Sequence, residues 1–482
     1  MNYRIIFRVV GRILMAVAAF MLPAMIISFC YGEMLPGYVF LGTIVATGLC
    51  GFLLARTKQK SRNFYAREGF VTVGLAWIVV SLFGALPFFF SGEIPNFVDA
   101  LFETVSGFTT TGASILPNVE AMSHGLLYWR SFTHWLGGMG VLVFVLALGP
   151  VAGGEFGDSL HLLRAESPGP QVSKLVPRMQ RTAKILYGIY IVLTMIQVVL
   201  LLIGRMPVLD AVTTTFGTAG TGGFSIRASS LGAYSPYCQT VTTVFMILFG
   251  VNFSLYYLLL MREVRAVLRS EELRLYLITI FAATLIIALN ILSAYGSFGE
   301  AFHHAIFQVA SIMTTTGFAT ADFNVWPELI RAILLLLMFM GACAGSTGGG
   351  LKVSRVLLAF KSARRAVHRT LRPNSVKLVH MDGELVEDST VSEVQSYFLI
   401  YFFIMAFSVL IVSLDNFSFE TSFSAVAACL NNIGPGLDVV GPTGNFASLS
   451  LLSKLVLIFD MLLGRLELYP ILILFAPAVW KK

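Results

Sequence analysis

The feature that most constrains this chain is an order of apolar runs that repeats four times along its 482 residues. In each copy a long run is followed by a shorter run, a glycine-ending element and a second long run. A helix needs about 20 apolar residues to cross the hydrocarbon core of a bilayer, so the shorter runs cannot cross it. Recurrence at roughly one hundred residues indicates one structural unit used four times.

The runs can be assigned to residues directly. The long runs lie near 69–91 and 125–150, 185–204 and 237–261, 273–295 and 327–360, and 394–414 and 449–479. The short runs lie at 98–110, 208–219, 299–314 and 418–431, and two further runs near 10–31 and 36–55 predict an N-terminal hairpin. We therefore expect an all-α membrane fold with about ten spanning helices, in which four helix–re-entrant helix–helix units surround one pore with pseudo-fourfold symmetry. The expected domains are 1–67, 68–183, 184–272, 273–392 and 393–482.

Composition supports this class. Hydrophobic residues make up 56% of the chain and charged residues 12%, whereas a soluble domain carries about a quarter charged residues. The five cysteines have no CxxC spacing, which argues against a zinc site or a disulfide framework. No HExxH or GxSxG motif is present, so an enzyme is not expected.

The basic residues predict the orientation in the membrane. Most of the 33 lysines and arginines lie in the N-terminal segment, in four polar links between units and at the C-terminus. By the positive-inside rule, that side is the cytoplasm and both termini are cytoplasmic. The net charge of +7 then reports topology and offers a surface to anionic lipid, and nucleic acid is not an expected partner.

The glycine-ending elements carry the chemistry. Their glycines are Gly112, Gly223, Gly317 and Gly434. Non-helical backbone at membrane depth leaves carbonyl groups without partners unless it lines a wet cavity. In a cation pathway these carbonyls replace the ion's hydration shell. A single Thr-Thr-Gly sequence is a common loop, but four behind short helices indicate a filter.

The short helices support the interpretation of a cation filter. Each begins with polar or acidic residues, among them Asp99, Asp210 and Glu300, and then becomes apolar. An acid at a helix N-terminus is favoured by capping and by the helix dipole. The C-terminal ends, with partial negative charge on their carbonyls, would then face the glycine elements and suit a cation.

This arrangement resembles the Trk/Ktr/HKT superfamily of potassium transporters, and within it the bacterial TrkH-type subunits, over nearly the whole chain. The resemblance implies potassium uptake across the bacterial inner membrane, with potassium as the only bound ion and no organic cofactor. It places the filter carbonyls on Thr110, Thr111, Thr221, Gly222, Thr315, Thr316, Asn432 and Ile433. Gly112, where sodium-preferring relatives often carry serine, favours potassium. The fourth element, Asn-Asn-Ile-Gly-Pro, lacks threonines and departs from fourfold symmetry.

A second glycine-rich stretch, 341–350, interrupts the second long run of the third unit. Five glycines in ten residues break a helix, at about 1 kcal/mol each relative to alanine. A phosphate loop is excluded by the missing Gly-Lys-Ser/Thr ending. A small-residue helix contact is the structural alternative. The resemblance implies instead an intramembrane gate below the filter, comprising Gly345, Ser346, Thr347, Gly348 and Gly349.

Charged residues inside apolar runs are expensive and are usually paired or functional. Arg465 lies in the last run, and two interpretations stay open: a structural pair with an acid such as Asp460, or, by the resemblance, an arginine beside the pore. Arg130 is interpreted as an anchor near the outer interface. His134, His303 and His304 lack metal-ligand spacing and are expected to be structural or vestibule residues.

The resemblance also implies partners: a second copy of this chain as a homodimer, and a cytoplasmic nucleotide-binding regulatory subunit of TrkA type. The link 361–393 is the expected contact of the regulatory subunit. The chain itself has no nucleotide-binding motif. Coupled entry with protons or sodium remains an alternative to channel-like conduction.

Overall fold

The computed structural model describes residues 1–57, 65–140, 179–374 and 377–480. These residues are mostly helical. The end of the expected run 125–150, much of the basic link after it and the C-terminal Lys481 and Lys482 lie outside the described residues. Six described helical segments are long and apolar enough to cross a bilayer, and a seventh is added if one bent pair of helices counts as a single span.

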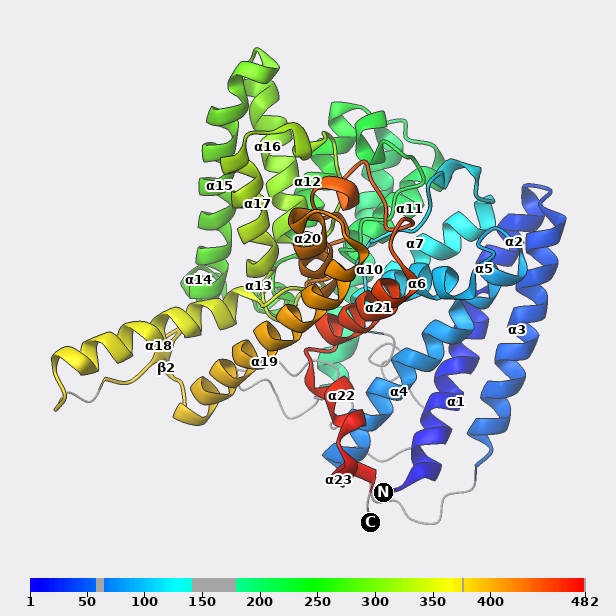
Figure 1. Ribbon diagram of the computed structural model, residues 1–482, viewed down its shortest axis with the longest axis horizontal. Coiled ribbons are helices and arrows are strands. Elements are labelled where there is room, and N and C mark those ends of the chain that lie inside the picture. The colour runs from blue at the N-terminus through cyan, green and yellow to red at the C-terminus, as the bar shows by residue number, and fades with distance from the viewer. Residues whose placement is uncertain (58–64, 141–178, 375–376, 481–482) are drawn as a thin grey trace.

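The N-terminal hairpin forms one edge of the molecule (Figure 1). Its first arm is α1 (Tyr3–Phe20) followed by α2 (Leu22–Cys30), and its second arm is α3 (Met34–Ala55). The arms touch through glycines: a Cβ added to Gly11 would lie 2.5 Å from the carbonyl oxygen of Gly51. Small residues allow this close backbone approach between membrane helices.

Each unit then begins with a long helix. These are α4 (Ala66–Gly84) with its short continuation α5 (Leu86–Phe90), α10 (Met179–Ile203), α15 (Glu271–Tyr295) and α19 (Asp388–Val412). Their outer faces carry exposed large apolar side chains such as Phe281, Leu289 and Phe403. In water such a surface would be an aggregation site, so it indicates contact with lipid.

Short helices follow, at nearly the residues that the sequence predicts. They are α6 (Phe97–Phe108), α11 (Val208–Ala219), α16 (Phe298–Met313) and α20 (Phe419–Leu430). A 12-residue helix is about 18 Å long, too short for a hydrocarbon core of about 30 Å. Every one carries an acid in its first turn, namely Asp99, Asp210, Glu300 and Glu420. The prediction of acidic N-terminal turns is confirmed at Asp99, Asp210 and Glu300, and Glu420 adds a fourth.

The second long run is broken in the second, third and fourth units, whereas the sequence predicts a break only in the third. The helices are α7 (His124–Gly138) in the first unit, α12 (Pro236–Phe249) and α13 (Phe253–Leu260) in the second, α17 (Glu328–Met340) and α18 (Val353–Leu371) in the third, and α21 (Leu451–Arg465) and α22 (Tyr469–Leu472) in the fourth. The expectation of continuous runs at 237–261 and 449–479 is therefore wrong. At the first break α12 and α13 meet at 89°, and Asn252 caps the new helix through the amide of Ser254.

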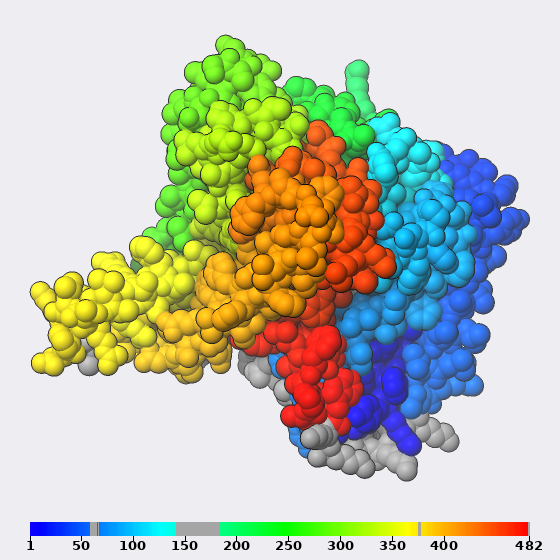
Figure 2. Space-filling view, viewed as in Figure 1, coloured from blue at the N-terminus to red at the C-terminus, as the bar shows by residue number. Residues whose placement is uncertain are grey.

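Helix α18 projects from the body of the molecule on the side where both chain ends lie (Figures 1 and 2). Its base packs on α19 and on a small antiparallel pair, β1 (His380–Met381) with β2 (Glu384–Leu385). Its far half exposes Val367 and Leu371 among basic residues. The remaining short helices are α14 (Val264–Arg269) and α23 (Pro477–Trp480).

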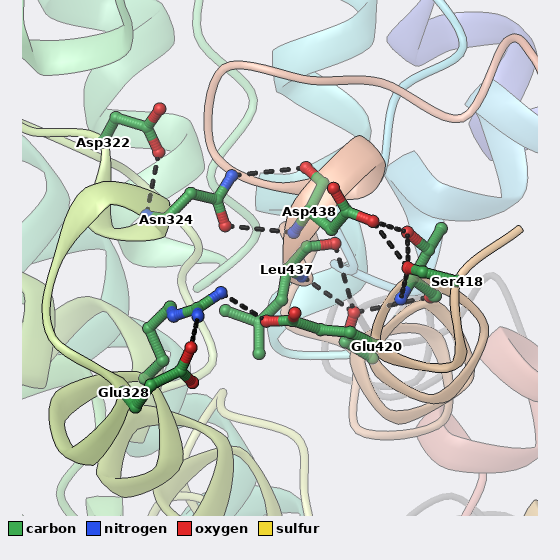
Figure 3. Close-up of polar contacts among 10 residues, drawn as sticks. Asp322, Asn324, Glu328, Ser418, Glu420, Leu437 and Asp438 are labelled. Atoms are coloured by element: carbon green, nitrogen blue, oxygen red, sulfur yellow. Dashed lines mark hydrogen bonds and ion pairs between the residues drawn. The ribbon is translucent and has the colours of Figure 1, made fainter.

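On the opposite side, the segments that follow the third and fourth glycine elements are joined by a polar network, the outer bridge (Figure 3). The Asn324 side chain pairs with both backbone groups of Asp438, at 3.0 and 3.2 Å. The Asp438 carboxylate accepts hydrogen bonds from Ser418 and Thr421, each at 2.6 Å. The bridge therefore couples the third unit to the fourth.

Candidate functional site: a ring of four turns

The four glycine-ending elements share one backbone conformation. Two residues after the end of each short helix comes a residue with left-handed φ: Thr110 (55°), Thr221 (54°), Thr315 (59°) and Asn432 (54°). Two residues later comes a glycine, also with positive φ: Gly112 (80°), Gly223 (75°), Gly317 (84°) and Gly434 (100°). Non-glycine residues seldom adopt such angles, and where they persist the surrounding structure enforces them.

The hydrogen bonding of the turns is equivalent as well. The residue between the two left-handed positions donates its N–H to a carbonyl five residues back in the short helix. These bonds run from Thr111 to Ser106, Gly222 to Gly217, Thr316 to Ser311 and Ile433 to Ala428, at 2.8–2.9 Å. This is the Schellman arrangement that ends helices with a left-handed residue. Asn432 adopts it like the threonines, so the departure of the fourth sequence does not change its backbone.

The turns meet in a closed ring. A Cβ added to Gly112 would lie 1.9 Å from the Gly222 oxygen, and one on Gly223 would lie 1.9 Å from the Thr316 oxygen. The same contact joins Gly317 to Ile433 at 2.0 Å, and Gly434 to Thr111 at 2.8 Å. Each glycine thus faces the equivalent carbonyl of the next unit, and the fourth returns to the first. Any larger residue would push two turns apart.

The side chains behind the ring differ from unit to unit. In the first and third turns two threonine hydroxyls bond each other, Thr109 with Thr111 at 2.8 Å and Thr314 with Thr316 at 2.7 Å. In the fourth, the Asn432 amide donates to the Thr111 hydroxyl and to the Met461 carbonyl, each at 2.9 Å. Asn432 therefore ties the fourth turn to the first.

The glycine-rich stretch lies against this ring. The chain leaves helical geometry between Met340 and Val353. The Gly349 amide donates to the Thr315 hydroxyl at 2.6 Å, and the Gly350 amide donates to the Asn431 carbonyl at 3.0 Å. A Cβ on Gly349 would lie 2.4 Å from the Asn431 oxygen. The loop therefore packs directly on the third and fourth turns.

Its other contacts reach the second unit. The Cys343 amide donates to the Gly250 carbonyl at 3.1 Å, and the Phe253 amide donates to the Gly345 carbonyl at 3.0 Å. The buried Glu272 carboxylate accepts from the amides of Ala344 and Ser354, at 2.7 and 3.1 Å. These bonds explain the break after α12, because the free backbone groups on both sides satisfy one another.

Arg465 joins the loop to the ring. Its guanidinium donates to the Thr110 hydroxyl at 3.2 Å and to the Thr347 carbonyl at 2.8 Å. It also donates to the carbonyls of Gly137 and Gly138 at the end of α7, at 2.5 and 2.7 Å. The structural pair with Asp460 that the sequence left open is wrong, since the Asp460 carboxylate accepts instead from Ser408 at 2.8 Å.

The surroundings of Arg130 differ from the interface anchor that the sequence predicts. It is 3% exposed and forms a 2.5 Å ion pair with Glu103 of α6, so it is not an interface anchor. Its guanidinium also donates to the Ser225 carbonyl at 2.9 Å and stacks over the Phe224 ring. Arginine suits this task because it binds a carboxylate, a carbonyl and an aromatic face together. An arginine in an apolar run was the only sequence signal.

The sequence did not indicate the partners of two further buried residues, Arg355 and Lys352. Arg355, at the start of α18, forms an ion pair with Glu467 in the break after α21. Lys352 precedes it and donates to the Gly348 carbonyl inside the loop. Both runs contain charges at membrane depth, which marks them as paired or functional. The pairing itself joins segments more than a hundred residues apart and has no local signal.

The histidines have structural contacts, as expected. His303 bonds the Gln239 side chain at 2.7 Å, and His304 bonds the Thr320 hydroxyl at 3.0 Å. His134 is fully buried between the first and second turns. Among the described residues no group of three or more His, Cys, Asp or Glu side chains could hold a metal ion.

Comparisons with known proteins agree with this geometry. Residues 38–482 match the family model TrkH, described as a cation transport protein. The Trk system potassium uptake proteins TrkH of Salmonella typhimurium and of Halomonas elongata are each 36% identical, with 100% of both chains covered. The crystal structure of the potassium transporter TrkH from Vibrio parahaemolyticus aligns over 100% of both chains, with a TM-score of 0.88 and 32% identity. The chain is a multi-pass membrane protein that belongs to the TrkH family of cation transport proteins.

Proposed function

We propose that this chain takes up potassium by conducting it through the ring of four turns. The observation that carries the proposal is the closed ring of glycine-to-carbonyl contacts among Thr111, Gly222, Thr316 and Ile433. Four equivalent turns supply rings of oxygens that replace the hydration shell of an ion. The names of the full-length relatives, which are potassium uptake proteins, support the same ion. Gly112 in the first turn is consistent with a preference for potassium over sodium.

The proposed arrangement is a pseudo-fourfold assembly of the units 68–183, 184–272, 273–392 and 393–482 around one pore, with 1–67 at its edge. In the second, third and fourth units the second run crosses as two segments joined by a break. Both chain ends lie on the side where α18 projects (Figure 1). By the positive-inside rule this side faces the cytoplasm, and the membrane is the bacterial inner membrane.

Gating belongs to the loop with Gly345, Ser346, Thr347, Gly348 and Gly349, held by Arg465. Its packing on the third and fourth turns is that of a closed plug. A neutral hydrogen bond contributes about 0.5–1.5 kcal/mol and one to a charged group about 1.5–3 kcal/mol. Arg465 bonds Thr347 and the ring together, so it restrains the part of the loop that lies against the ring.

The proposed partners act through α18. Its basic, partly apolar far half stands clear of the body (Figure 2). A cytoplasmic regulatory subunit of TrkA type is the proposed contact of the link 361–393. A second copy of this chain and anionic lipid are further proposed partners. The Arg355–Glu467 ion pair connects the base of α18 to the break after α21, so force on α18 reaches the loop.

The experiment is ion flux in vesicles that contain the purified chain and only potassium or sodium salts. We expect potassium uptake that exceeds sodium uptake, and a Gly112→Ser variant that reduces the difference. The matched control is Gly42→Ser, because Gly42 lies in α3 with open space around it. Equal flux of both ions in the parent, or unchanged selectivity in Gly112→Ser, would contradict the proposed filter.

Proton-coupled entry is the second candidate, and one buried acid favours it. Asp460 is 0% exposed, and the described residues supply no hydrogen-bond partner for its Oδ2 atom. An ionisable side chain inside the membrane without a charged partner marks a functional site for ion or proton movement. The reversal potential decides: a value that follows potassium alone supports conduction, whereas a shift with the proton gradient that Asp460→Asn abolishes supports coupling.

A further inference from the structure

The second turn of the ring lacks the side chains that support the others. Where the first and third turns place paired threonines, the second has Gly220 and Gly222. Glycine loses more conformational freedom on folding than any other residue. The Gly-Thr-Gly-Gly backbone of the second turn therefore needs support from other parts of the chain. That support comes from one residue of α7.

His134 occupies the space of the missing side chains. A Cβ added to Gly222 would lie 2.3–2.6 Å from three atoms of the imidazole ring. The ring also packs on Phe224, with centroids 4.2 Å apart. Arg130, one helical turn earlier, covers the same phenylalanine at 3.5 Å. Residues i and i+4 share a helix face, so one face of α7 holds Phe224, the residue that follows the second turn.

The imidazole also fixes the backbone through both nitrogens. Nε2 accepts a hydrogen bond from the Phe224 amide at 3.2 Å, so it carries no proton. Nδ1 then carries the proton and donates it to the Gly107 carbonyl at 2.8 Å. One neutral ring thus links the short helix of the first unit to the second turn.

We propose that His134 is a positioning residue for ion selectivity: it substitutes for the absent side chains of the second turn and sets the distance of that turn from the pore axis. This rests on the proposed function of the ring as a filter. Without the imidazole of His134, the Phe224 amide loses its hydrogen-bond acceptor, and Gly220 and Gly222 gain room to move. The carbonyls of Thr221 and Gly222 would then adapt to a smaller ion.

The first test compares potassium and sodium flux for His134→Ala and His134→Gln. An amide presents a donor and an acceptor about as far apart as the two ring nitrogens. We expect His134→Ala to lower the potassium-to-sodium flux ratio by a factor of about ten, as for a buried donor that loses its acceptor. His134→Gln should keep most of the ratio. A ratio unchanged in a folded His134→Ala, or equal losses in both variants, would overturn the proposal.

The second test uses the steric contact itself. In the parent, Gly222→Ala should reduce selectivity because its Cβ meets the imidazole ring of His134. In the His134→Ala background, the same substitution should cause a smaller loss of selectivity. Gly220→Ala is the matched control, since its Cβ meets the backbone oxygen of His134 at 2.2 Å, which alanine retains. Its effect should be equal in both backgrounds. Rescue of both glycine variants, or of neither, would contradict the assigned contact.

These outcomes separate the two proposals. If Gly112→Ser and Gly222→Ala leave selectivity unchanged, the ring is not the filter. If Gly112→Ser lowers selectivity while both His134 variants keep it, the filter stands and the role of His134 fails. Thermal unfolding of each purified variant in detergent identifies any that have simply lost their fold.

Discussion

At the scale of single residues, the ring depends on positions where only a hydrogen is tolerated. Gly317 combines a φ of 84° with a contact that leaves 2.0 Å between an added Cβ and the Ile433 oxygen. The atom in the way is backbone, so it cannot rotate aside. Thr315, two residues earlier, holds a left-handed angle despite its branched side chain, and its hydroxyl accepts a hydrogen bond from the Gly349 amide.

We therefore predict that Gly317→Ala abolishes selective potassium flux. The physical reason is the clash with a neighbouring turn together with an unfavourable backbone angle. Gly299→Ala, in α16 of the same unit, is the control, since nothing lies within 4 Å of its added Cβ. Flux in vesicles measures both, and normal selectivity in Gly317→Ala would contradict the close contact.

Arg465 leads to a second prediction at this scale. Arg465→Ala removes the bonds to Thr110 and Thr347, so we expect faster cation uptake through a less restrained loop. Arg465→Lys keeps the charge but cannot bond four oxygens in a planar fan. If hydrogen bonding dominates, the lysine variant is also faster, and if charge dominates it stays slow. Unchanged uptake in both variants would assign Arg465 to structure alone.

At the scale of elements, the loop at 341–352 is held by partners that differ in strength. Backbone bonds to Gly250 and Asn431 are single neutral contacts. Glu272, buried at the start of α15, accepts two amides from the two sides of the loop. A charged acceptor makes Glu272 a stronger anchor than those neutral contacts, so the loop is fixed at its base. Residues 345–349 are held instead by Arg465 and by the bond from Gly349 to Thr315.

Deleting residues 345–349 should consequently raise ion flux at unchanged ion preference. The ring keeps its own hydrogen bonds in this variant, while the plug and its bond to Thr315 are removed or displaced. Vesicle flux at several potassium gradients gives the measurement. A variant that folds but conducts no faster would argue against gating by this loop.

At the scale of the whole molecule, the units are held together by contacts that join distant segments. Asn432 ties the fourth turn to the first, and the hydrogen bond from Arg130 to the Ser225 carbonyl ties the first unit to the second. The outer bridge ties the third to the fourth (Figure 3). Hydrogen bonds from Ser418 and then from Thr421 lower the pKa of Asp438 below its ordinary value.

This bridge predicts a dependence of stability on pH. A lowered pKa means that the ionised carboxylate favours the folded state, so the stabilisation is complete above the unfolded value of about 3.9. It is lost as the pH falls through the lower folded value. Thermal unfolding in detergent should show a parent that loses more stability between pH 5 and about pH 3 than Asp438→Asn does. Parallel curves for the two proteins would contradict the contribution of Asp438.

The sequence by itself determined the short helices, the positions of the turn glycines and the glycine-rich interruption. These follow from local causes: run length against membrane thickness, acids at helix starts, and the backbone freedom of glycine. Only the tertiary structure decided the breaks after Phe249 and Arg465, the partners of Arg130 and Arg465, and the place of His134 behind the second turn. Each of these depends on a hydrogen-bond acceptor or a carboxylate supplied by a distant segment, and a local pattern carries no record of such a partner.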